Sequence, residues 1–326
     1  MLIIPEEKIL EFKNFLARHE FFFIAGHKEP DGDCVYSCLA MANILDKLNL
    51  PYQLLNSGPF KRTEIKNKAD LFSSQPVFLS ESKRKKTGLI ILDCSETQRL
   101  GEIAENLRGV DSYIIDHHLT ANVTTDCIID STSPAAACLV QQIHEKIAGP
   151  LSKESAEYLF FAIATDTGYF RFLSEKSSEV FKQSARLIEA GANPGIIYDK
   201  ITGGKPFSTR KLIGLLLLRA ERYCGNKLVI TYETAEDSKK FAQEGRDSDA
   251  LYSLFLAADG IEAVVFFRQE NEHTCTAGFR SKKDIDVSKI AAKFGGGGHK
   301  NASGASIEGK LEAVIQKVIE EFSKIL

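Results

Sequence analysis

The fold of the chain is decided near its beginning by the stretch FFFIAGHKEPDGD, residues 21–33. Its first six residues form a continuous apolar run, which is typical of a strand buried on both faces of a sheet. The polar residues after this run predict a loop, and the apolar spacing over residues 33–48 predicts a helix. A buried strand followed by a helix indicates a sheet covered by helices.

The same pattern returns further along the first half of the chain. Further strands are predicted at 52–55, at 88–93 (GLIILD) and at 112–116 (SYIID), and further helices at 134–149, 152–165 and 177–190. Short apolar runs that alternate with helices indicate a parallel sheet with helices on both faces. We therefore predict an α/β fold for this part of the chain.

The length of 326 residues favours two domains over a single core. Glycine and proline are concentrated in residues 191–207 (GANPGIIYDKITGGKPF), where we predict a linker between a domain of residues 1–190 and a smaller α/β domain of residues 208–326. The second domain is expected to start with a helix over 208–223 capped by Ser208. Its other predicted elements are strands at 227–232, 261–268 and 273–280, a helix near 286–293, and a last amphipathic helix with Leu311, Val314, Ile315, Val318, Ile319 and Phe322 on one face.

Composition and charge limit the classes of function. The chain has 41 Lys and Arg against 44 Asp and Glu, a formal charge of −3, so it lacks the basic field that grips long duplex nucleic acid. No apolar run approaches the roughly 18–20 residues of a membrane span, and charged residues interrupt the N-terminus before a signal peptide could form. The seven cysteines include no C-x-x-C pair and are expected to be packing residues in a reducing compartment. We expect a cytoplasmic protein without a membrane partner.

Acidic residues and histidines follow three of the predicted strands. Ligands of open parallel sheets bind at the carboxyl ends of the strands, where loops converge. A further acid ends the predicted helix that leads to Asp-Thr-Gly. The residues concerned are His27, Asp31, Asp33, Asp93, Asp116, His117, His118 and Asp166.

Several carboxylates in one cleft cannot all stay ionised without a compensating cation. Mixed carboxylate and imidazole ligands suit Mn²⁺, Fe²⁺, Co²⁺ or Zn²⁺ better than Mg²⁺. A bridging carboxylate would hold two such ions ~3.5–4 Å apart, as in two-metal phosphoesterases that activate a water molecule. Taken singly, Asp31-Gly32 would be an ordinary turn and Asp93 an ordinary helix cap. Three successive strand ends of this kind favour the metal site.

These residues form a recognisable set. The segments HKEPDGD at 27–33, Asp93, DHH at 116–118 and DTG at 166–168 resemble the four motifs of the DHH phosphoesterase superfamily. The segment GGGGHKNASG at 295–304, preceded by GFRS at 278–281, resembles the glycine-rich motif of the associated DHHA1 domain. The size and two-domain layout resemble the stand-alone nano-RNase and pAp-phosphatase branch of that superfamily.

The resemblance implies a role for each residue of the site. One metal would be held by His27, Asp31 and Asp93, and a second by Asp33, Asp93, His117 and Asp166, with Asp93 as the bridge. His118 would contact the scissile phosphate or assist the leaving oxygen, and Asp116 would orient a ligand.

The glycine run predicts a substrate-binding element. Glycines allow positive φ and close backbone approach, so that successive N–H groups can face an anion. Arg280 offers a fork for phosphate and His299 a further donor, which makes Arg280, Gly297, Gly298 and His299 the expected substrate-binding residues. The run is not a P-loop, because His299 stands where that motif has glycine. A flexible hinge is the alternative.

Together, these expectations predict a phosphoesterase that uses two divalent metal ions, and Mn²⁺ is the expected ion. The resemblance implies substrates such as short oligoribonucleotides (nanoRNA), the linear dinucleotide pApA, and the 3′-phosphate of pAp. The slightly acidic charge agrees with short substrates, since a long polymer would gain from an extended basic track. Cleavage of cyclic di-AMP and a non-catalytic nucleotide sensor are the alternatives, and a homodimer is left open.

Overall fold

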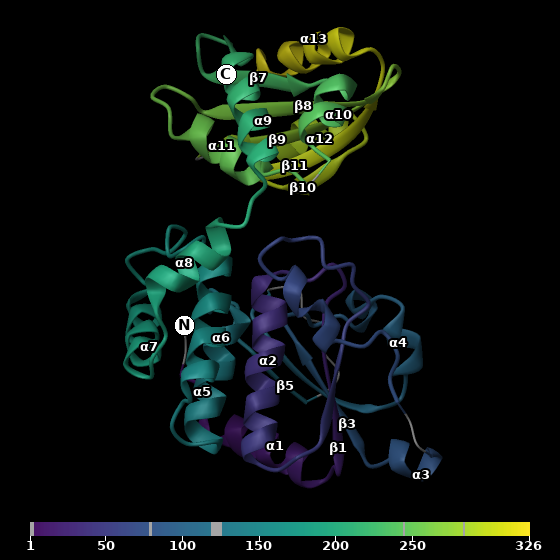
Figure 1. The fold of residues 1–326 in the computed structure, drawn as a ribbon, viewed down its shortest axis with the longest axis vertical. Helices are drawn as coiled ribbons and strands as arrows, with labels where there is room; N and C mark the ends of the chain where they lie inside the picture. Colours follow the sequence, from purple (N-terminus) through teal and green to yellow (C-terminus); the bar gives the residue numbers. More distant parts are fainter. Residues whose placement is uncertain (1–2, 78–79, 119–125, 244, 283) are drawn as a thin grey trace. The chain divides into compact units, whose positions relative to one another are not determined.

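The computed structural model describes residues 3–77, 80–118, 126–243, 245–282 and 284–326. The chain divides into two compact units, Met1–Gly204 and Lys205–Leu326 (Figure 1). The predicted linker, residues 191–207, contains helix α8 (Pro194–Thr202), which belongs to the first unit. Asn193 caps this helix through its side chain and Pro194 occupies the first turn, so the glycine and proline signals mark a helix start as well as a connection.

Within the described residues, the first unit contains a five-stranded sheet in the order β2-β1-β3-β4-β5, in which every neighbouring pair is parallel. The predicted parallel sheet is therefore confirmed. The fifth strand was not predicted. The strands are β1 (Phe21–Gly26), β2 (Tyr52–Leu55), β3 (Thr87–Leu92), β4 (Asp111–Asp116) and β5 (Asp126–Ile129).

Helices cover both faces of this sheet, because successive residues of a strand point to opposite sides. Phe22 and Ile24 pack into the cluster under the long helices, whereas Phe23 and Ala25 face the cluster that contains Leu100. The first face is covered by α1 (Glu6–Ala17), α2 (Gly32–Lys47) and α5 (Ala136–Ile147), with α6 (Lys153–Asp166) and α7 (Ser178–Glu189) beside them. The second face is covered by η2 (Thr97–Leu100) and α4 (Ile103–Asn106); the remaining short helices are η1 (Lys66–Leu71) and α3 (Glu81–Arg84).

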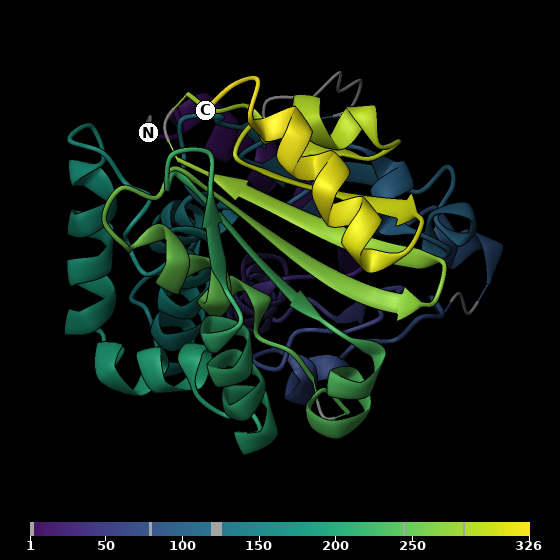
Figure 2. The same cartoon turned by 90° about the horizontal axis from the view of Figure 1, so that it is seen from above.

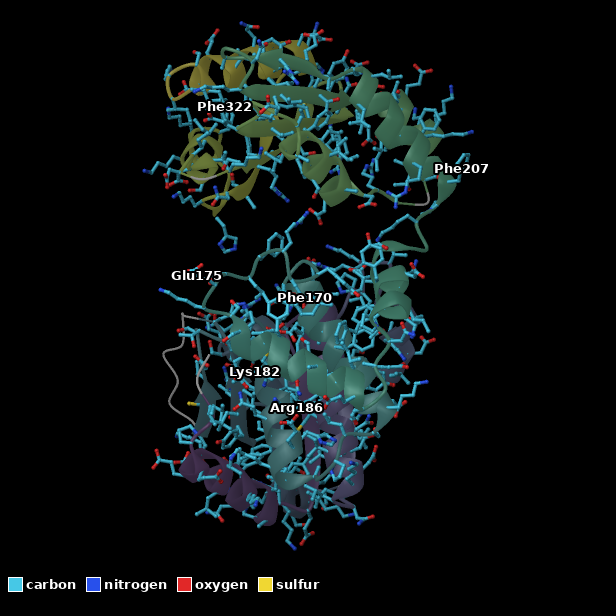
Figure 3. The ribbon with its side chains drawn as sticks, turned by 90° about the vertical axis from the view of Figure 1, so that its left-hand side faces the viewer. Phe170, Glu175, Lys182, Arg186, Phe207 and Phe322 are labelled. Carbon is cyan, nitrogen blue, oxygen red and sulfur yellow. The ribbon has the colours of Figure 1, made fainter. Side chains whose placement is uncertain are left out.

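The start of α2 lies very close to the end of α6. An ideal Cβ on Gly32 would lie 2.5 Å from Thr165 Oγ1, so a larger residue there would push the two helices apart. Further along, the rings of Tyr36 and Phe161 stack with centroids 4.0 Å apart. On the far side of α5, Arg186 of α7 donates from Nε to Glu145 Oε1 at 2.9 Å (Figure 3). The first two contacts fix α2 against α6, the helices that carry Asp33 and Asp166, and the third holds α7 against α5.

The second unit contains a six-stranded mixed sheet in the described residues, in the order β10-β11-β9-β8-β7-β6. Only the pair β7 and β8 is parallel. The helix α13 lies across the sheet, and its Phe322 is fully buried (Figures 2 and 3). The strands are β6 (Glu221–Tyr223), β7 (Leu228–Glu233), β8 (Ala263–Asn271), β9 (Thr274–Ser281), β10 (Gly297–His299) and β11 (Ala302–Glu308); the helices are α9 (Phe207–Leu218), α10 (Ala235–Phe241), α11 (Ser248–Leu256), α12 (Val287–Lys293) and α13 (Leu311–Phe322).

One predicted element of the second unit is wrong. The helix expected over 208–223 ends at Leu218, and its cap position is Pro206 rather than Ser208. Residues Cys224, Gly225 and Asn226 all have positive φ, which forms the turn that pairs β6 with β7. Formation of this hairpin therefore ends the helix earlier than its apolar pattern predicted.

None of the helices in these described ranges combines the length and apolar character needed to cross a membrane.

Candidate metal centre and substrate-binding strands

The register of the first sheet brings three strand ends together. Gly26 of β1 lies opposite Leu92 of β3, and Leu92 lies opposite Ile115 of β4. The next residues along these strands are His27, Asp93 and Asp116, which therefore meet at one edge. The backbone N–H of Asp93 donates to Ile115 O at 3.1 Å, so the turn after β3 stays attached to β4. Asp93 has φ of 60°, an uncommon backbone conformation for a residue other than glycine.

Two more carboxylates come from the start of α2. Asp31 caps this helix by accepting a hydrogen bond from Cys34 N at 3.1 Å. Asp33 accepts from the backbone N–H groups of Ala136 and Ala137 at 2.6 and 3.0 Å, at the beginning of α5. Ser37 Oγ also donates to Asp33 Oδ1, at 2.9 Å. The end of α6 supplies Asp166, whose position follows from the close packing of the two helices.

Asp93 lies at the centre of this group. Its two oxygens lie 3.4 Å from His27 Nε2 and 3.2 Å from His117 Nε2. His117 Nε2 is also 3.4 Å from Asp166 Oδ2 and 3.8 Å from Asp33 Oδ2. The group is completed by Asp31, whose Oδ1 is 3.9 Å from His27 Nε2. The six residues predicted as metal ligands are thus brought together, although they span residues 27–166.

The two histidines are oriented in the same way. Nδ1 of His27 lies 2.8 Å from Lys28 O, and Nδ1 of His117 lies 3.2 Å from Ser133 O. A carbonyl oxygen only accepts, so each Nδ1 must carry a proton. The Nε2 atoms then face carboxylate oxygens with a lone pair, an arrangement that needs either an additional proton or a cation. Histidines that bind metals are commonly held in this manner by a second hydrogen bond.

The acidic groups disturb one another's ionisation. Burial, followed by the nearby charges of Asp93 and Asp166, raises the pKa of Asp33 well above its usual range. Burial and Asp93 also raise the pKa of Asp166 to about 6, although His117 acts to lower it. Burial alone would lower the pKa of His117, but the carboxylates around it raise the value to about 10. The site therefore contains more negative charge than its histidines neutralise.

The donor set fits a divalent cation. Among the described residues, Asp93 Oδ1 and Asp116 Oδ2 are buried without a hydrogen-bond partner. The groups whose ligand atoms lie within 4.8 Å of one another include Asp33, His117 and Asp166 as one set and Asp93 with residues 116–118 as another. Buried unpaired carboxylate oxygens are costly, and a bound cation would satisfy them. Carboxylates with imidazoles suit Mn²⁺ and related ions.

His118 differs from the other two histidines. Its Nδ1 lies 2.8 Å from Asp116 Oδ1, which also accepts from the backbone N–H groups of His117 and His118 at 2.7 and 3.2 Å. Burial acts to raise the pKa of Asp116, but these hydrogen bonds and the charge of His118 lower it. Asp116 thus holds His118 in place, while the His118 side chain remains 38% exposed.

A cysteine predicted as a packing residue lies beside this centre, and backbone groups that the sequence reasoning missed support it. Cys34 Sγ lies within 4.8 Å of ligand atoms of His27 and Asp93, but burial and the neighbouring Cys38 raise the pKa of its thiol well above the usual range. Cys34 is therefore a neutral packing residue at this edge. The Ser133 carbonyl and the start of α5 also act through backbone atoms, which the residue types do not reveal. The spacing of Ser37, one helical turn after Asp33, is a signal that could have indicated their contact.

The predicted substrate-binding residues lie on neighbouring strands of the second sheet. His299 of β10 is opposite Ala302 of β11, and Ala302 is opposite Arg280 of β9. Residues in register share a face, so His299 and Arg280 lie on the same side of the sheet. The Arg280 guanidinium stands 4.5 Å from the ring centroid of Tyr252, a residue of α11. The glycine run is not an unpaired hinge, because Gly297 and Gly298 are paired with Gly304 and Ser303.

Glycines, which have no side chain, border a hollow on this face of the sheet. A cavity of about 410 Å³ is bordered by Tyr252, Arg268, Gly278, Gly296 and Gly304. An ideal Cβ on Gly278 would lie 2.0 Å from the Tyr252 hydroxyl, so glycine is what allows the tyrosine to lie against the sheet. Arg268 lines the hollow and Arg280 stacks on its Tyr252, and guanidinium groups in this position can bind a phosphate beside an aromatic base.

Comparison with known proteins identifies the family. Residues 22–163 match the N-terminal domain of the DHH family, and residues 226–324 match the DHHA1 domain. The chain therefore carries an N-terminal domain of the DHH family and a DHHA1 domain. Its enzyme class is phosphoric-ester hydrolase, as the resemblance had led us to expect.

Individual relatives cover nearly all of the chain. It is 29% identical over 311 residues to the bifunctional oligoribonuclease and PAP phosphatase NrnA of Thermus thermophilus, with 93% of this chain and 90% of that protein covered. A probable manganese-dependent inorganic pyrophosphatase of Bacillus pumilus is 22% identical and covers 74% of this chain and 80% of its own length. The crystal structure of an exopolyphosphatase-related protein from Bacteroides fragilis superposes with a TM-score of 0.84 at 23% identity, covering 100% of this chain and 99% of that one. The last comparison confirms the fold.

Proposed function

We propose that the chain hydrolyses short oligoribonucleotides, including pApA, and the 3′-phosphate of pAp, using two divalent metal ions. The observation that carries this proposal is the convergence of His27, Asp31, Asp33, Asp93, His117 and Asp166 around the buried Asp93 carboxylate. The relative named oligoribonuclease and PAP phosphatase supports the substrate class, and the relative named manganese-dependent pyrophosphatase supports Mn²⁺ as the ion.

The six ligand residues divide into two overlapping sets. His27 and Asp31 would share one ion with Asp93, while Asp33, His117 and Asp166 would share the other with Asp93. Such ions would supply a deprotonated water near neutral pH and neutralise charge on the phosphoryl group. The protein's own contribution is to hold the carboxylates close together despite their mutual repulsion, through the backbone donors at the start of α5 and the packing of α2 on α6.

We assign the contact with the phosphate to His118. Because Asp116 binds Nδ1 of this residue, Nε2 is the ring atom left for the substrate or for the leaving oxygen. A carboxylate that orients an imidazole in this way fixes the tautomer and the ring direction. Asp116 is therefore a positioning residue in this proposal.

The second unit would hold the other end of the substrate. Arg280 and His299 share one face with Gly297 and the hollow beside Tyr252, so a terminal phosphate and its base can bind there. The net charge of −3 favours short substrates, because long strands are usually bound by an extended basic surface.

A substrate panel with Mn²⁺ tests the proposal. The panel contains pAp, pApA, cyclic di-AMP, a series of oligoribonucleotides of increasing length, a long RNA and inorganic pyrophosphate, with a chelator as the control. We expect release of nucleoside monophosphate from pApA and short oligonucleotides, release of phosphate from pAp, and slow turnover of long RNA. A preference for cyclic di-AMP, for pyrophosphate or for long RNA would contradict the proposed substrate class, and undiminished turnover with the chelator would contradict the metal requirement.

A further inference from the structure

A second pocket in the first unit is lined by none of the proposed metal ligands. It has a volume of about 500 Å³ and lies among α2, α6, α8 and the segment around η1. The apolar part of its wall is formed by Tyr36, Phe161 and Ile197. Charged groups stand around this apolar surface: the carboxylates of Glu64, Glu154, Glu157 and Asp199, and the ammonium groups of Lys68 and Lys200.

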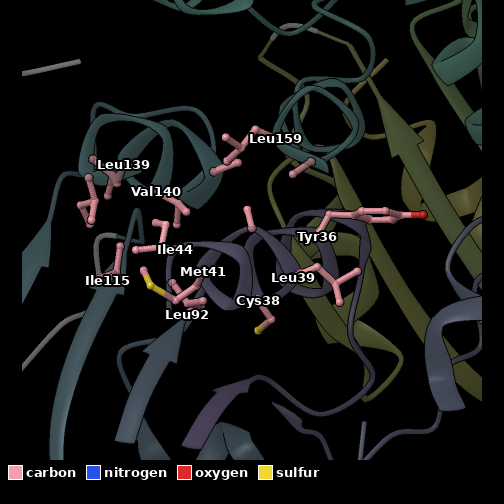
Figure 4. Close-up of a cluster of buried hydrophobic side chains, with 14 of the residues drawn as sticks. Tyr36, Cys38, Leu39, Met41, Ile44, Leu92, Ile115, Leu139, Val140 and Leu159 are labelled. Carbon is pink, nitrogen blue, oxygen red and sulfur yellow. The ribbon is translucent and has the colours of Figure 1, made fainter. Parts of the chain in front are cut away.

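Tyr36 places its phenol hydroxyl in this pocket. The residue is only 6% exposed, and its ring is fixed by stacking on Phe161 at 4.0 Å. Figure 4 shows its hydroxyl turned away from the other labelled side chains of the buried cluster. Among the described residues, this hydroxyl has no hydrogen-bond partner. Burial and the nearby Glu64 raise the pKa of Tyr36 to about 12, so the neutral phenol can donate or accept a hydrogen bond.

The charges of the pocket favour a cation with separated charges. Four carboxylates against two ammonium groups leave a net charge of about −2 when all are ionised. In the described part of the chain, these carboxylates do not belong to any group close enough to share one metal ion. A compact divalent metal ion would also gain nothing from the apolar wall. An elongated dication can reach separate carboxylates and bury its apolar middle.

The aromatic rings already attract an ammonium group. Lys68 Nζ lies 5.3 Å from the ring centroid of Tyr158 and 6.0 Å from that of Tyr36. These distances are typical of cation–π interactions, in which the ring face carries the negative part of its quadrupole. Lys68 already occupies these ring faces, so the wall offers a further ammonium group the carboxylates of the rim and the Tyr36 hydroxyl.

We propose that this pocket is a binding site for an aliphatic diammonium ion. Its ammonium ends would pair with carboxylates of the rim, its methylene groups would lie on Phe161 and Ile197, and one ammonium group would donate a hydrogen bond to the Tyr36 hydroxyl. Gly203 and Gly204 line the same pocket at the end of the first unit, so the ligand would contact the segment that leads into the second unit. The site is independent of the hydrolytic function proposed above.

Isothermal titration of the 326-residue, Mn²⁺-loaded protein with putrescine tests the proposal, with butylamine as the monoammonium control. We expect one putrescine site per chain, with affinity about tenfold higher than that for butylamine, because the second charge-assisted contact is missing in the monoamine. Glu157→Gln should weaken putrescine binding about tenfold, and Tyr36→Phe about threefold, since the second variant keeps the stacked ring.

The matched control is Glu175→Gln, which removes an exposed carboxylate outside the pocket and should leave the affinity unchanged (Figure 3). Thermal unfolding of each variant verifies that it folds. Absence of putrescine binding, equal binding of butylamine, or an unchanged affinity in both pocket variants would overturn the proposal. Equal weakening by Glu175→Gln would reduce the effect to nonspecific charge and would overturn it as well.

Discussion

The two units build their candidate sites in opposite ways. In the first unit, parallel strands bring together residues as distant as His27 and Asp166, and the result is a buried cluster of charge. In the second unit, Arg280, Gly297 and His299 come from a short segment of antiparallel strands, and the result is an open face shaped by missing side chains. The first arrangement requires the whole fold, whereas the second depends on a few strand pairings.

This difference predicts different consequences of mutation. Removing one ligand of the buried cluster changes the charge balance of every other member, because their pKa values are linked through Asp93. Changing one residue of the open face alters one contact and leaves its neighbours in place. Substitutions in the first unit should therefore affect the chemical step, and those in the second should affect substrate affinity.

The largest effect is expected from Asp93→Asn. An amide cannot replace the central carboxylate, and a loss of several kcal/mol of transition-state stabilisation corresponds to a decrease in kcat of about a thousandfold or more. Single-turnover hydrolysis of pApA with Mn²⁺ measures the decrease. The matched control is Asp111→Asn, at the opposite end of β4, where the carboxylate pairs with Arg18. If folded Asp93→Asn protein kept the wild-type kcat, the first unit would not be the one that determines the chemical step.

A smaller effect is expected from Arg280→Gln. Loss of the guanidinium group, which can donate two hydrogen bonds to a phosphate, should raise KM by about one to two orders of magnitude, with a much smaller change in kcat. Steady-state kinetics on pApA separate the two constants. Arg222→Gln, on the exposed edge strand β6 of the same sheet, is the control and should leave KM unchanged. A fall in kcat at constant KM would place Arg280 in the chemical step instead.

Much of the first unit could be predicted because its strands are continuous apolar runs and its polar residues follow them directly. The fifth strand, β5, was missed because its four residues include only two aliphatic ones and carry no distinct pattern. The convergence of the six ligands was expected from the strand ends, but the support of Asp33 by Ala136 and Ala137 was not. Backbone donors leave no signature in residue type.

The second unit was less accessible to sequence reasoning. The glycine run was expected to approach an anion, but its pairing as β10 with β11 was not predicted, because glycine has a weak strand preference. The helix over 208–223 was predicted too long, since a hairpin turn with positive φ at Cys224 and Asn226 has no warning in an apolar pattern. Both errors arise because strand pairing in the folded domain, which the local sequence pattern does not show, determines the structure of these segments.

The glycine run also permits a test of backbone geometry. Gly298 has φ of 140°, and an ideal Cβ there would lie 2.7 Å from Ala302 O, so Gly298→Ala should destabilise the second unit by about 2 kcal/mol. Gly297 has open space around the same position, so Gly297→Ala should change the free energy of unfolding by less than about 0.5 kcal/mol. Urea unfolding of both variants measures the difference. Equal stability of the two would show that the β10–β11 pairing does not require glycine at Gly298.

The smallest effect concerns a buried histidine outside either candidate site. His144 of α5 is fully buried, and within the described ranges neither ring nitrogen has a hydrogen-bond partner. Burial, helped by the charge of Lys47, lowers its pKa from 6.5 to about 4. The unfolded chain therefore binds a proton more readily than the folded one, so this contribution to stability is complete above about pH 6.5 and is lost as the pH falls toward 4.

Replacing His144 should flatten this part of the pH dependence. His144→Leu keeps an apolar side chain in the helix and removes the titrating group, so the stability lost between pH 7 and pH 5 should be about 2 kcal/mol smaller than in the wild type. Urea unfolding at a series of pH values gives both curves, and His273→Asn, at an exposed turn, controls for loss of a histidine as such. Parallel curves for the wild type and His144→Leu would mean that the ring has the same pKa in the folded and the unfolded chain and would contradict the prediction. A flatter curve for the variant would show that part of the acid sensitivity of the first unit arises outside its carboxylate cluster.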